Sequence, residues 1–238
     1  MAGKEISKPS TSVPLDAEIS IIAADEYVSR SGLKLKGALD TFGQIDVVGK
    51  SCLDVGASTG GFTDVLLRHG ANKVIAIDVG HDQFSKDLAA NPRVQSFEGI
   101  NARELTLEQL RELTADPDLE IDLVVADLSF ISLTLVLPAL AKIVKKGEFV
   151  LLIKPQFEVG KQSLSASGVV SDHRLRTFAI NQVVDCCQDL GLSVLGLERS
   201  KLAGTHGNIE YLIWISTAKA PNQSILTERI EQLAREGK

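Results

Sequence analysis

The chain has 238 residues, 44% of them hydrophobic and 24% charged, which is enough apolar material for one substantial hydrophobic core. Its formal net charge of −6 excludes a surface that binds phosphate groups over its whole extent, because non-specific affinity for nucleic acids comes from Lys and Arg side chains that displace counterions. Any contact with a nucleic acid must therefore be local, or be made by a segment outside this sequence.

The three cysteines, Cys52, Cys186 and Cys187, have neither the spacing of a disulfide framework nor that of metal ligands, so we expect reduced thiols and no metal site. The N-terminus lacks an apolar signal region, and no run reaches the roughly 18 apolar residues that a membrane-spanning helix needs. These patterns predict a soluble, cytoplasmic protein without a membrane partner.

Residues 1–26 begin polar and proline-containing and end in a short strand-like run that stops at Ala23-Ala24. One or two unpaired strands cannot form a domain. From residue 27 to Gly43 the pattern is that of a short amphipathic helix, with Ser29 or Ser31 as its candidate cap. Its apolar face is formed by Leu33, Ala38, Leu39 and Phe42.

Beyond residue 50, apolar runs of strand length alternate with amphipathic stretches of helix length, which indicates right-handed crossovers and a parallel sheet. The expected strands cover 51–56, 73–80, 93–99, 118–129 and 148–155, and the helices between them cover 61–69, 106–113 and 134–144.

A long helix at 172–190 precedes two more strands, 192–202 and 209–217, which no helix separates, so they should form an antiparallel hairpin. A surface helix within 222–238 ends the chain. We therefore predict an α/β fold of the Rossmann-like, class I methyltransferase type, with a mostly parallel seven-stranded sheet and a terminal antiparallel hairpin. Dinucleotide-binding dehydrogenases usually lack that hairpin.

A glycine-rich loop follows the first predicted strand and opens a helix, an arrangement in which a ligand can approach the backbone closely. The loop consists of Gly56, Ala57, Ser58, Thr59, Gly60, Gly61, Phe62 and Thr63, and Asp54 precedes it. Ser58 replaces the middle glycine of the dinucleotide-binding pattern. S-adenosylmethionine has no pyrophosphate, and the carboxylate of Asp54 can meet its cationic amino-acid end directly or through water. The alternative is that the glycines merely permit a turn from strand to helix.

Polar residues also end the next three predicted strands. Asp78-Val79 ends the second strand, where a carboxylate can accept hydrogen bonds from ribose hydroxyls. Asn101 follows the third strand and can contact an adenine edge, and Asp127 ends the fourth. Because ligands bind at the carboxyl edge of open α/β sheets, these residues and the loop predict an S-adenosylmethionine site.

The residues resemble those of the TlyA-like ribosomal RNA methyltransferases, a family often named hemolysins and related to the FtsJ ribose methyltransferases. The strings that carry the resemblance are YVSRSGLKLKGAL, LDVGASTGGFTDVLL, VIAIDVGHDQ, VVADLSFISL, LLIKPQFEVG, GVVSDHRLR and GTHGNIEYLIWI. The resemblance implies methylation of ribose 2′-hydroxyls, with cytidine as the nucleotide and ribosomal RNA or ribosomal subunits as the substrate. It also implies that 1–26 is the remnant of a truncated RNA-binding module of the ribosomal-protein type, with a linker, ahead of a methyltransferase domain at 27–238.

Relatives of this kind use a Lys-Asp-Lys-Glu set, which the resemblance carries onto Lys34 in SGLKL, Asp127 in ADLSF, Lys154 in LLIKPQ and Glu210 in GNIEY. Lys36 competes with Lys34, but the family string has its lysine directly after Gly-Leu. All four positions stand at element ends or on the first helix and face the same rim. For each of them the alternative is a solvated surface charge.

A ribose hydroxyl is a poor nucleophile until its proton is removed, so the implied reaction needs a proton acceptor. We assign Lys154 as this general base, since burial and the nearby ammonium of Lys34 both favour the neutral amine. Asp127 should orient Lys154, and Glu210 should complete the hydrogen-bond network. His206 is a weaker candidate, because histidines in glycine-containing loops such as GTHGN are more often exposed turn residues.

Phe130 and Phe157, with Gln156 beside them, can stack on a flipped-out nucleotide or else cap the core. Arg30 and Lys36 form a basic cluster with the lysine between them, which is either a phosphate contact or a solvated helix face.

Three alternative functions compete with ribose methylation. A methyltransferase acting on a base or a small molecule would share the cofactor loop, but the usual N-P-P-Y motif of base-amine enzymes is absent. A membrane-lytic hemolysin would need a spanning segment or a strongly basic amphipathic helix, and the sequence shows neither. An RNA-binding protein that has lost catalysis would not need the intact Lys-Asp-Lys-Glu set.

Overall fold

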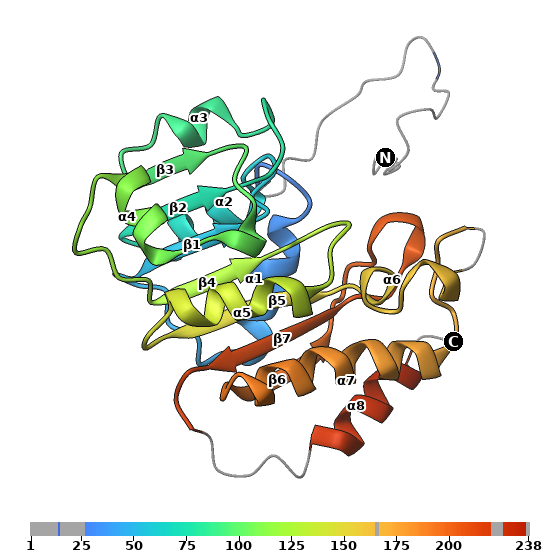
Figure 1. Ribbon diagram of the computed structural model, residues 1–238. Coiled ribbons are helices and arrows are strands. Elements are labelled where there is room, and N and C mark those ends of the chain that lie inside the picture. Colours follow the sequence, from blue (N-terminus) through green and yellow to red (C-terminus); the bar gives the residue numbers. More distant parts are fainter. Residues whose placement is uncertain (1–13, 15–26, 165–166, 220–225, 237–238) are drawn as a thin grey trace.

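The computed structural model describes residues 14, 27–164, 167–219 and 226–236 (Figure 1). In this part of the chain one seven-stranded sheet has the order β3-β2-β1-β4-β5-β7-β6. The strands are β1 (Ser51–Val55), β2 (Lys73–Ile77), β3 (Val94–Phe97), β4 (Leu123–Ala126), β5 (Glu148–Ile153), β6 (Ser193–Arg199) and β7 (Tyr211–Ser216). The strands from β3 to β5 pair in parallel, and β7 pairs antiparallel with both β5 and β6.

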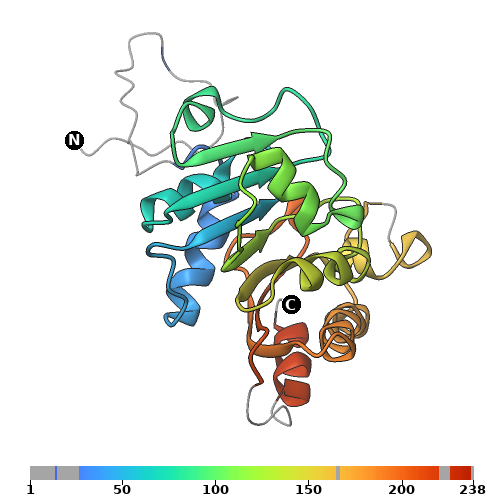
Figure 2. The ribbon, with the colours of Figure 1, turned by 60° about the vertical axis from the view of Figure 1, so that its left-hand side comes forward.

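Helices cover both faces of the sheet (Figure 2). They are α1 (Gly32–Phe42), α2 (Gly61–Arg68), α3 (Lys86–Ala89), α4 (Leu107–Thr114), α5 (Leu133–Ile143), α6 (Pro155–Glu158), α7 (His173–Asp189) and α8 (Leu226–Arg235). Short 3-10 turns lie at η1 (Ala102–Glu104), η2 (Lys161–Ser163) and η3 (Thr205–Gly207). The helices α1 and α2 pack on one face, and α4, α5, α7 and α8 pack on the other.

Alternation along each central strand builds these two cores. In β5, Phe149 and Leu151 face the core under α5 and α7, whereas Val150 and Leu152 face the core under α1 and α2. A strand buried on both faces must be apolar throughout, which is why the sequence shows continuous apolar runs.

The predicted α/β fold and the terminal antiparallel hairpin are confirmed. Several boundaries were wrong. The helix predicted from residue 27 begins at Gly32, and the Ser31 hydroxyl does not cap it but shares a hydrogen bond of 2.6 Å with the Ser29 hydroxyl. The strand expected at 118–129 shortens to β4, because its first apolar residues pack onto the core from a loop. The strand-like run before residue 27 and the domain assigned there lie outside the described residues.

No helix within the described ranges is long and apolar enough to cross a membrane. The thiols of Cys52, Cys186 and Cys187 are free, and in the same ranges no group of three His, Cys, Asp or Glu side chains is arranged to hold a metal ion.

Arg176 fastens the last helix to the body of the domain. Its side chain is only 3% exposed. The guanidinium donates from Nε and Nη2 to the carbonyl of Ala234 at 3.0 and 2.7 Å, and from Nη1 to the carbonyls of Val170 and Ser171 at 3.2 and 2.6 Å. One planar cation therefore joins α7, α8 and the segment before α7.

Arg176→Met should lower the free energy of unfolding by about 2–4 kcal/mol, because buried carbonyls would lose charged donors. Urea denaturation followed by circular dichroism measures this change. Arg174→Met, an exposed arginine on the same helix, is the matched control and should stay within about 0.5 kcal/mol of the parent. Equal effects of the two changes would contradict the assignment.

Candidate active site

The loops that follow the parallel strands enclose a cavity of about 590 Å³ at the carboxyl edge of the sheet. Among the residues predicted to bind a cofactor, those that line it are Gly56, Ser58, Asp78, Val79, Asn101 and Asp127. Small-molecule sites typically measure about 300–1,000 Å³, so this cavity is large enough for a nucleoside-sized ligand.

The loop after β1 needs glycine for two different reasons. Gly56 has φ of 78°, and a Cβ there would lie 2.9 Å from the Leu128 side chain, so it permits both the turn and the approach of the next loop. At Gly61 a Cβ would lie 2.2 and 2.3 Å from the hydroxyls of Ser29 and Ser31. Gly61 therefore makes room for the segment that leads into α1, a role that the sequence pattern did not reveal.

Asp78 ties two loops together below the cavity. Its Oδ2 accepts from the backbone N–H of Ser58 at 2.7 Å, and its Oδ1 accepts from that of Gly80 at 2.7 Å. Sequence reasoning missed Gln83, which lines the same cavity and accepts from the Ser58 hydroxyl at 3.2 Å.

Glu98 holds the segment around Gln83. Its carboxylate accepts from the backbone N–H groups of Asp82, Gln83 and Phe84 at 2.7, 3.0 and 3.3 Å. These hydrogen bonds lower the pKa of Glu98. Glu98 follows the third strand, so the rule that strand ends carry functional groups could have identified it.

Asp54 is placed differently from the prediction. It is 1% exposed, lies beneath the loop and is not among the residues that line the cavity. Its Oδ2 accepts from the Thr63 hydroxyl at 2.6 Å, while its Oδ1 is buried without a hydrogen-bond partner. Burial raises the pKa of Asp54 to about 7, against the opposing effect of the Thr63 hydrogen bonds.

Lys34, Asp127, Lys154 and Glu210 lie together next to the cavity and are called the quartet below. The Lys34 Nζ is 2.6 Å from Glu210 Oε2 and 3.7 Å from Asp127 Oδ2, and the Lys154 Nζ is 2.7 Å from Asp127 Oδ1. None of the four side chains is more than 13% exposed. Negative and positive groups thus alternate along a line, which offsets the cost of burying charge.

Neighbours fix both ends of the quartet. The Lys154 ammonium donates to the Ser129 hydroxyl at 3.0 Å, and the Gln156 amide donates to Glu210 Oε1 at 3.4 Å. A Cβ on Gly204 would lie 2.0 Å from the same Glu210 oxygen, so a side chain there would displace the Glu210 carboxylate from the quartet. Neither Ser129 nor Gly204 was predicted, because each acts on a residue distant in the sequence.

The quartet stands between the first cavity and two others. A cavity of about 280 Å³ is lined by Ser58, Asp127 and Lys154, and it shares Arg30 with a more open cavity of about 590 Å³ that Lys34 and His206 also line. The cavities are joined by shared residues. A small molecule on one side and a larger acceptor on the other could therefore meet at Lys154 and Asp127.

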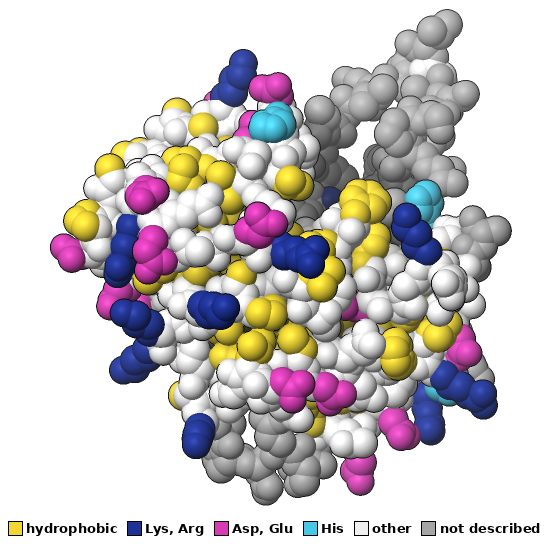
Figure 3. Space-filling view, viewed as in Figure 1, with side chains coloured by type: hydrophobic (Ala, Val, Ile, Leu, Met, Phe, Trp, Pro, Cys, Tyr) yellow, Lys and Arg dark blue, Asp and Glu magenta, His cyan; other side chains and the backbone are white. Residues whose placement is uncertain are grey.

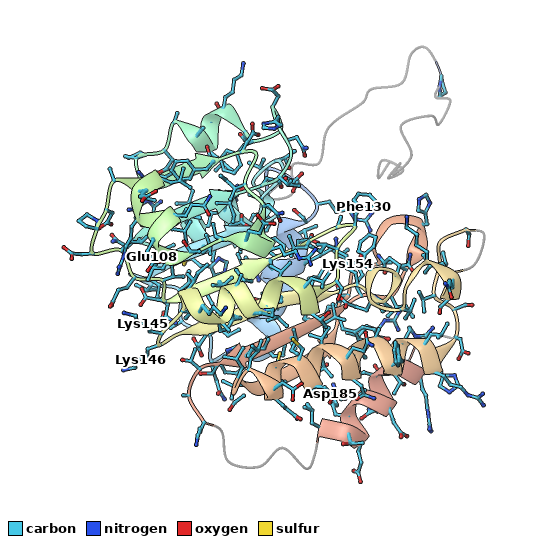
Figure 4. All side chains as sticks on the ribbon, viewed as in Figure 1. Glu108, Phe130, Lys145, Lys146, Lys154 and Asp185 are labelled. Atoms are coloured by element: carbon cyan, nitrogen blue, oxygen red, sulfur yellow. The ribbon has the colours of Figure 1, made fainter. Side chains whose placement is uncertain are left out.

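Phe130 projects from the rim of this site. It is 91% exposed and has φ of 67°, a conformation that costs a bulky residue on the order of 1–3 kcal/mol. Its ring lies 5.3 Å from that of Phe157, centroid to centroid, and the Lys154 Nζ lies 5.8 Å from the Phe157 centroid. Figure 4 shows Phe130 and Lys154 on the side of the molecule opposite to Lys145 and Lys146.

The two other cations predicted at the site, Arg30 and Lys36, have different surroundings. Arg30 lines the cavities and donates to the Ala203 carbonyl at 3.4 Å. Lys36 is exposed and pairs with Asp40 at 2.5 Å, outside the quartet. On the face shown in Figure 3, Lys and Arg side chains are interspersed with Asp and Glu rather than gathered into one basic field.

A mostly parallel seven-stranded sheet with a terminal antiparallel pair, and a ligand cavity at its carboxyl edge, defines the Rossmann-like class I methyltransferases. The family model described as FtsJ-like methyltransferase matches residues 27–217. The chain belongs to this family, and it is a methyltransferase.

Two named relatives are similar to this chain over most of its length. The 16S/23S rRNA (cytidine-2′-O)-methyltransferase TlyA of Mycobacterium tuberculosis is 46% identical over 213 residues, which are 88% of this chain and 76% of that protein. Hemolysin A of Brachyspira hyodysenteriae is 40% identical over 211 residues, 88% of this chain and 85% of that protein.

Solved structures show the same fold. One described as a hemolysin from Streptococcus thermophilus has a TM-score of 0.80 and 39% identity, covering 87% of this chain and 73% of that one. An S-adenosylmethionine-dependent methyltransferase from Listeria monocytogenes, at 16% identity and a TM-score of 0.56, shares the fold over 78% of this chain and 100% of its own.

Asp54→Asn should make the stability less dependent on pH. In the unfolded chain an Asp ionises near pH 3.9, whereas burial raises the pKa of Asp54 to about 7, so the parent loses stability as the pH rises between these values. Between about pH 5 and about pH 8, the free energy of unfolding of the variant should therefore rise by about 1–3 kcal/mol relative to the parent. Urea denaturation at the two pH values tests this, and a difference that does not change with pH would refute it.

Proposed function

We propose that this protein transfers a methyl group from S-adenosylmethionine to the 2′-hydroxyl of a ribose, in a cytidine of ribosomal RNA. The observation that carries the proposal is the quartet of alternating ammonium and carboxylate groups between a nucleoside-sized cavity and an open one. The name of the Mycobacterium tuberculosis relative, an rRNA (cytidine-2′-O)-methyltransferase, supports the choice of ribose, cytidine and ribosomal RNA.

The residues present fit S-adenosylmethionine, which supplies an activated methyl group on a cationic sulfur when bound. Asp78 offers a carboxylate for ribose hydroxyls in the cavity. Asn101 uses its Oδ1 to accept from the Arg103 N–H, so a contact to adenine would come from its amide nitrogen. The carboxyl of Asp54 lies under the loop with its Oδ1 unpartnered, and a cationic group bound above it would favour the ionised form of this carboxyl.

Lys154 would take the proton from the ribose hydroxyl. To do so its amine must be neutral, which leaves one ammonium, that of Lys34, beside the carboxylates of Asp127 and Glu210. Proton transfer then creates a second ammonium 2.7 Å from Asp127, and the quartet becomes electrically balanced. The site thus stabilises the charge that develops during the reaction, which is how preorganised groups lower a barrier.

The acceptor would enter from the open cavity. Arg30 can contact a phosphate there, and the exposed ring of Phe130, backed by Phe157, offers a surface on which an unstacked base can lie. We assign the methyltransferase domain to 27–238 and place the enzyme's action in the cytoplasm, on ribosomal RNA or ribosomal subunits.

A second candidate is a lytic activity, which the name of the Brachyspira hyodysenteriae relative favours. The quartet and the cavities give such an activity no chemical basis. A methyltransferase for a base or a small molecule would use the same cofactor cavity but would not need Lys154 as a base.

Asp78→Ala should weaken the binding of S-adenosylmethionine and of its demethylated product by about 1–3 kcal/mol, because charged hydrogen bonds are lost. Titration calorimetry measures both ligands. Asp116→Ala, which breaks the ion pair with Lys73 away from the cavity, is the matched control and should bind like the parent. Binding of NAD as tight as that of S-adenosylmethionine would overturn the cofactor assignment.

Lys154→Arg should be almost inactive toward ribosomal RNA while binding S-adenosylmethionine normally, because a guanidinium keeps its proton and cannot act as a base. The parent rate should rise with pH, because the group that accepts the hydroxyl proton must itself be unprotonated, and Lys154→Arg should lack this rise. Transfer of labelled methyl groups to unmethylated ribosomal subunits, followed by nuclease digestion and mass spectrometry, measures the rate and should locate the label on the 2′-oxygen of cytidine.

Lys50→Arg is the matched control, since Lys50 pairs with Glu148 at 3.0 Å at the amino end of the sheet, and it should keep the parent's rate. Substantial transfer by Lys154→Arg would show that alignment alone drives the reaction. Label on a base, or none on RNA, would refute the ribose assignment.

A further inference from the structure

Glu158 is a buried carboxylate that the quartet does not include. It ends α6, four residues after Lys154, and is only 7% exposed. It accepts from the Ser132 hydroxyl through a short hydrogen bond and from the Leu133 N–H at 2.8 Å. Burial raises the pKa of Glu158, and these two hydrogen bonds oppose the rise. Both donors are neutral, so the carboxylate is buried in these contacts without a balancing charge.

Capping of α5 does not explain this arrangement. Ser132 already caps that helix, because its hydroxyl oxygen accepts from the Thr134 N–H at 3.1 Å. Burying a carboxylate costs more free energy than one further hydrogen bond to an N–H returns. What Glu158 adds is a connection between α6 and the first turn of α5.

This connection adds a second attachment between two segments, 127–133 and 154–158, next to the proposed reaction site. At one end the segment before α5 is tied to Lys154 through Asp127 at 2.7 Å and through the Ser129 hydroxyl at 3.0 Å. At the other end it is tied to Glu158 through the Leu133 N–H. Two segments that are 25 or more residues apart in sequence are thereby held together at both ends.

Phe130 lies between these ties. It is too exposed for burial to fix it, and its left-handed backbone is a conformation that persists only where the surroundings determine it. The bonds at Ser129 and Leu133 lie on either side of it, and its ring contacts that of Phe157, which belongs to α6. The position of Phe130 relative to Lys154 therefore depends on how α6 is attached.

We propose that Glu158 is a positioning residue, which sets Lys154 and Phe130 at a fixed distance from Asp127 before the acceptor binds. This inference rests on the proposed ribose methylation for its kinetic part only. Its structural part, the attachment of the loop at 127–133 to α6, holds whatever the acceptor is.

The experiment compares Glu158→Ala, Glu158→Gln and the control Asp122→Ala. Asp122 accepts from the Ser51 N–H at 2.9 Å at the opposite edge of the sheet, so its loss removes a similar hydrogen bond away from the site. Methyl transfer to ribosomal subunits, calorimetry with S-adenosylmethionine and hydrogen–deuterium exchange of the peptide covering 127–135 are measured for each variant.

Glu158→Ala should lower kcat at least 10-fold, change the KM for RNA less than 3-fold, leave the affinity for S-adenosylmethionine within 2-fold and speed exchange in 127–135. Glu158→Gln keeps an acceptor oxygen and should recover most of the rate and the protection. Asp122→Ala should keep kcat and the exchange of 127–135. A loss of kcat equal in Glu158→Ala and Asp122→Ala would show that Glu158 matters only for general stability.

Unchanged exchange in 127–135 with Glu158→Ala would overturn the proposal even if the rate falls. If the parent itself transfers no methyl group to RNA, the proposed function fails, and the exchange data still decide whether Glu158 attaches the loop.

Discussion

One carboxylate, that of Asp127, lies between two ammonium groups, and the rest of the site is arranged around it. Asp127 follows β4, in the middle of the sheet, so the strands on either side supply its surroundings. A lone carboxylate there would be costly to bury, and so would either lysine. The cost of burying each charge is offset only when the other charges are present. The quartet therefore requires α1, β4, β5 and β7 to be in place together.

Lys34 lies on α1, which precedes the sheet in the chain, so its position beside Asp127 depends on how α1 packs. Two glycines make this packing possible. A Cβ on Gly32 would lie 2.9 Å from the Gly61 carbonyl, and a Cβ on Gly61 would strike the serine hydroxyls before α1. The start of α1 thus packs directly on the start of α2, backbone against backbone. The same contact that shapes the loop after β1 therefore directs Lys34 toward Asp127.

The fold was predictable because each central strand is buried on both faces and is therefore continuously apolar, as in β5. Boundaries were less predictable, since Leu119 and Ile121 are as buried as strand residues but reach the core from a loop. The four-residue helix α6 has no periodicity to detect. Resemblance, rather than pattern, supplied the four residues that the structure brings together.

The residues that support the site follow a different logic. Ser129 and Lys154 are 25 residues apart, as are Leu133 and Glu158. Neither pair has a local pattern, because the bond depends on how two loops meet at the edge of a finished sheet. The residues at the ends of predicted strands include groups that line the cavity, such as Asp78. They do not include the residues that hold those groups in place.

The pairing of charges also bears on what the site contributes to RNA recognition. Lys34 and Lys36 are neutralised by Glu210 and Asp40, while Arg30 donates to a backbone carbonyl. Paired ammonium groups release few counterions when a phosphate approaches, so they add little affinity for RNA in general. In the proposed reaction, their fixed positions and the fixed ring of Phe130 would act instead on the alignment of one nucleotide. In the proposed reaction the site is therefore suited to select one nucleotide by its geometry once the RNA is bound. A strongly basic site would instead bind any RNA segment without this selection.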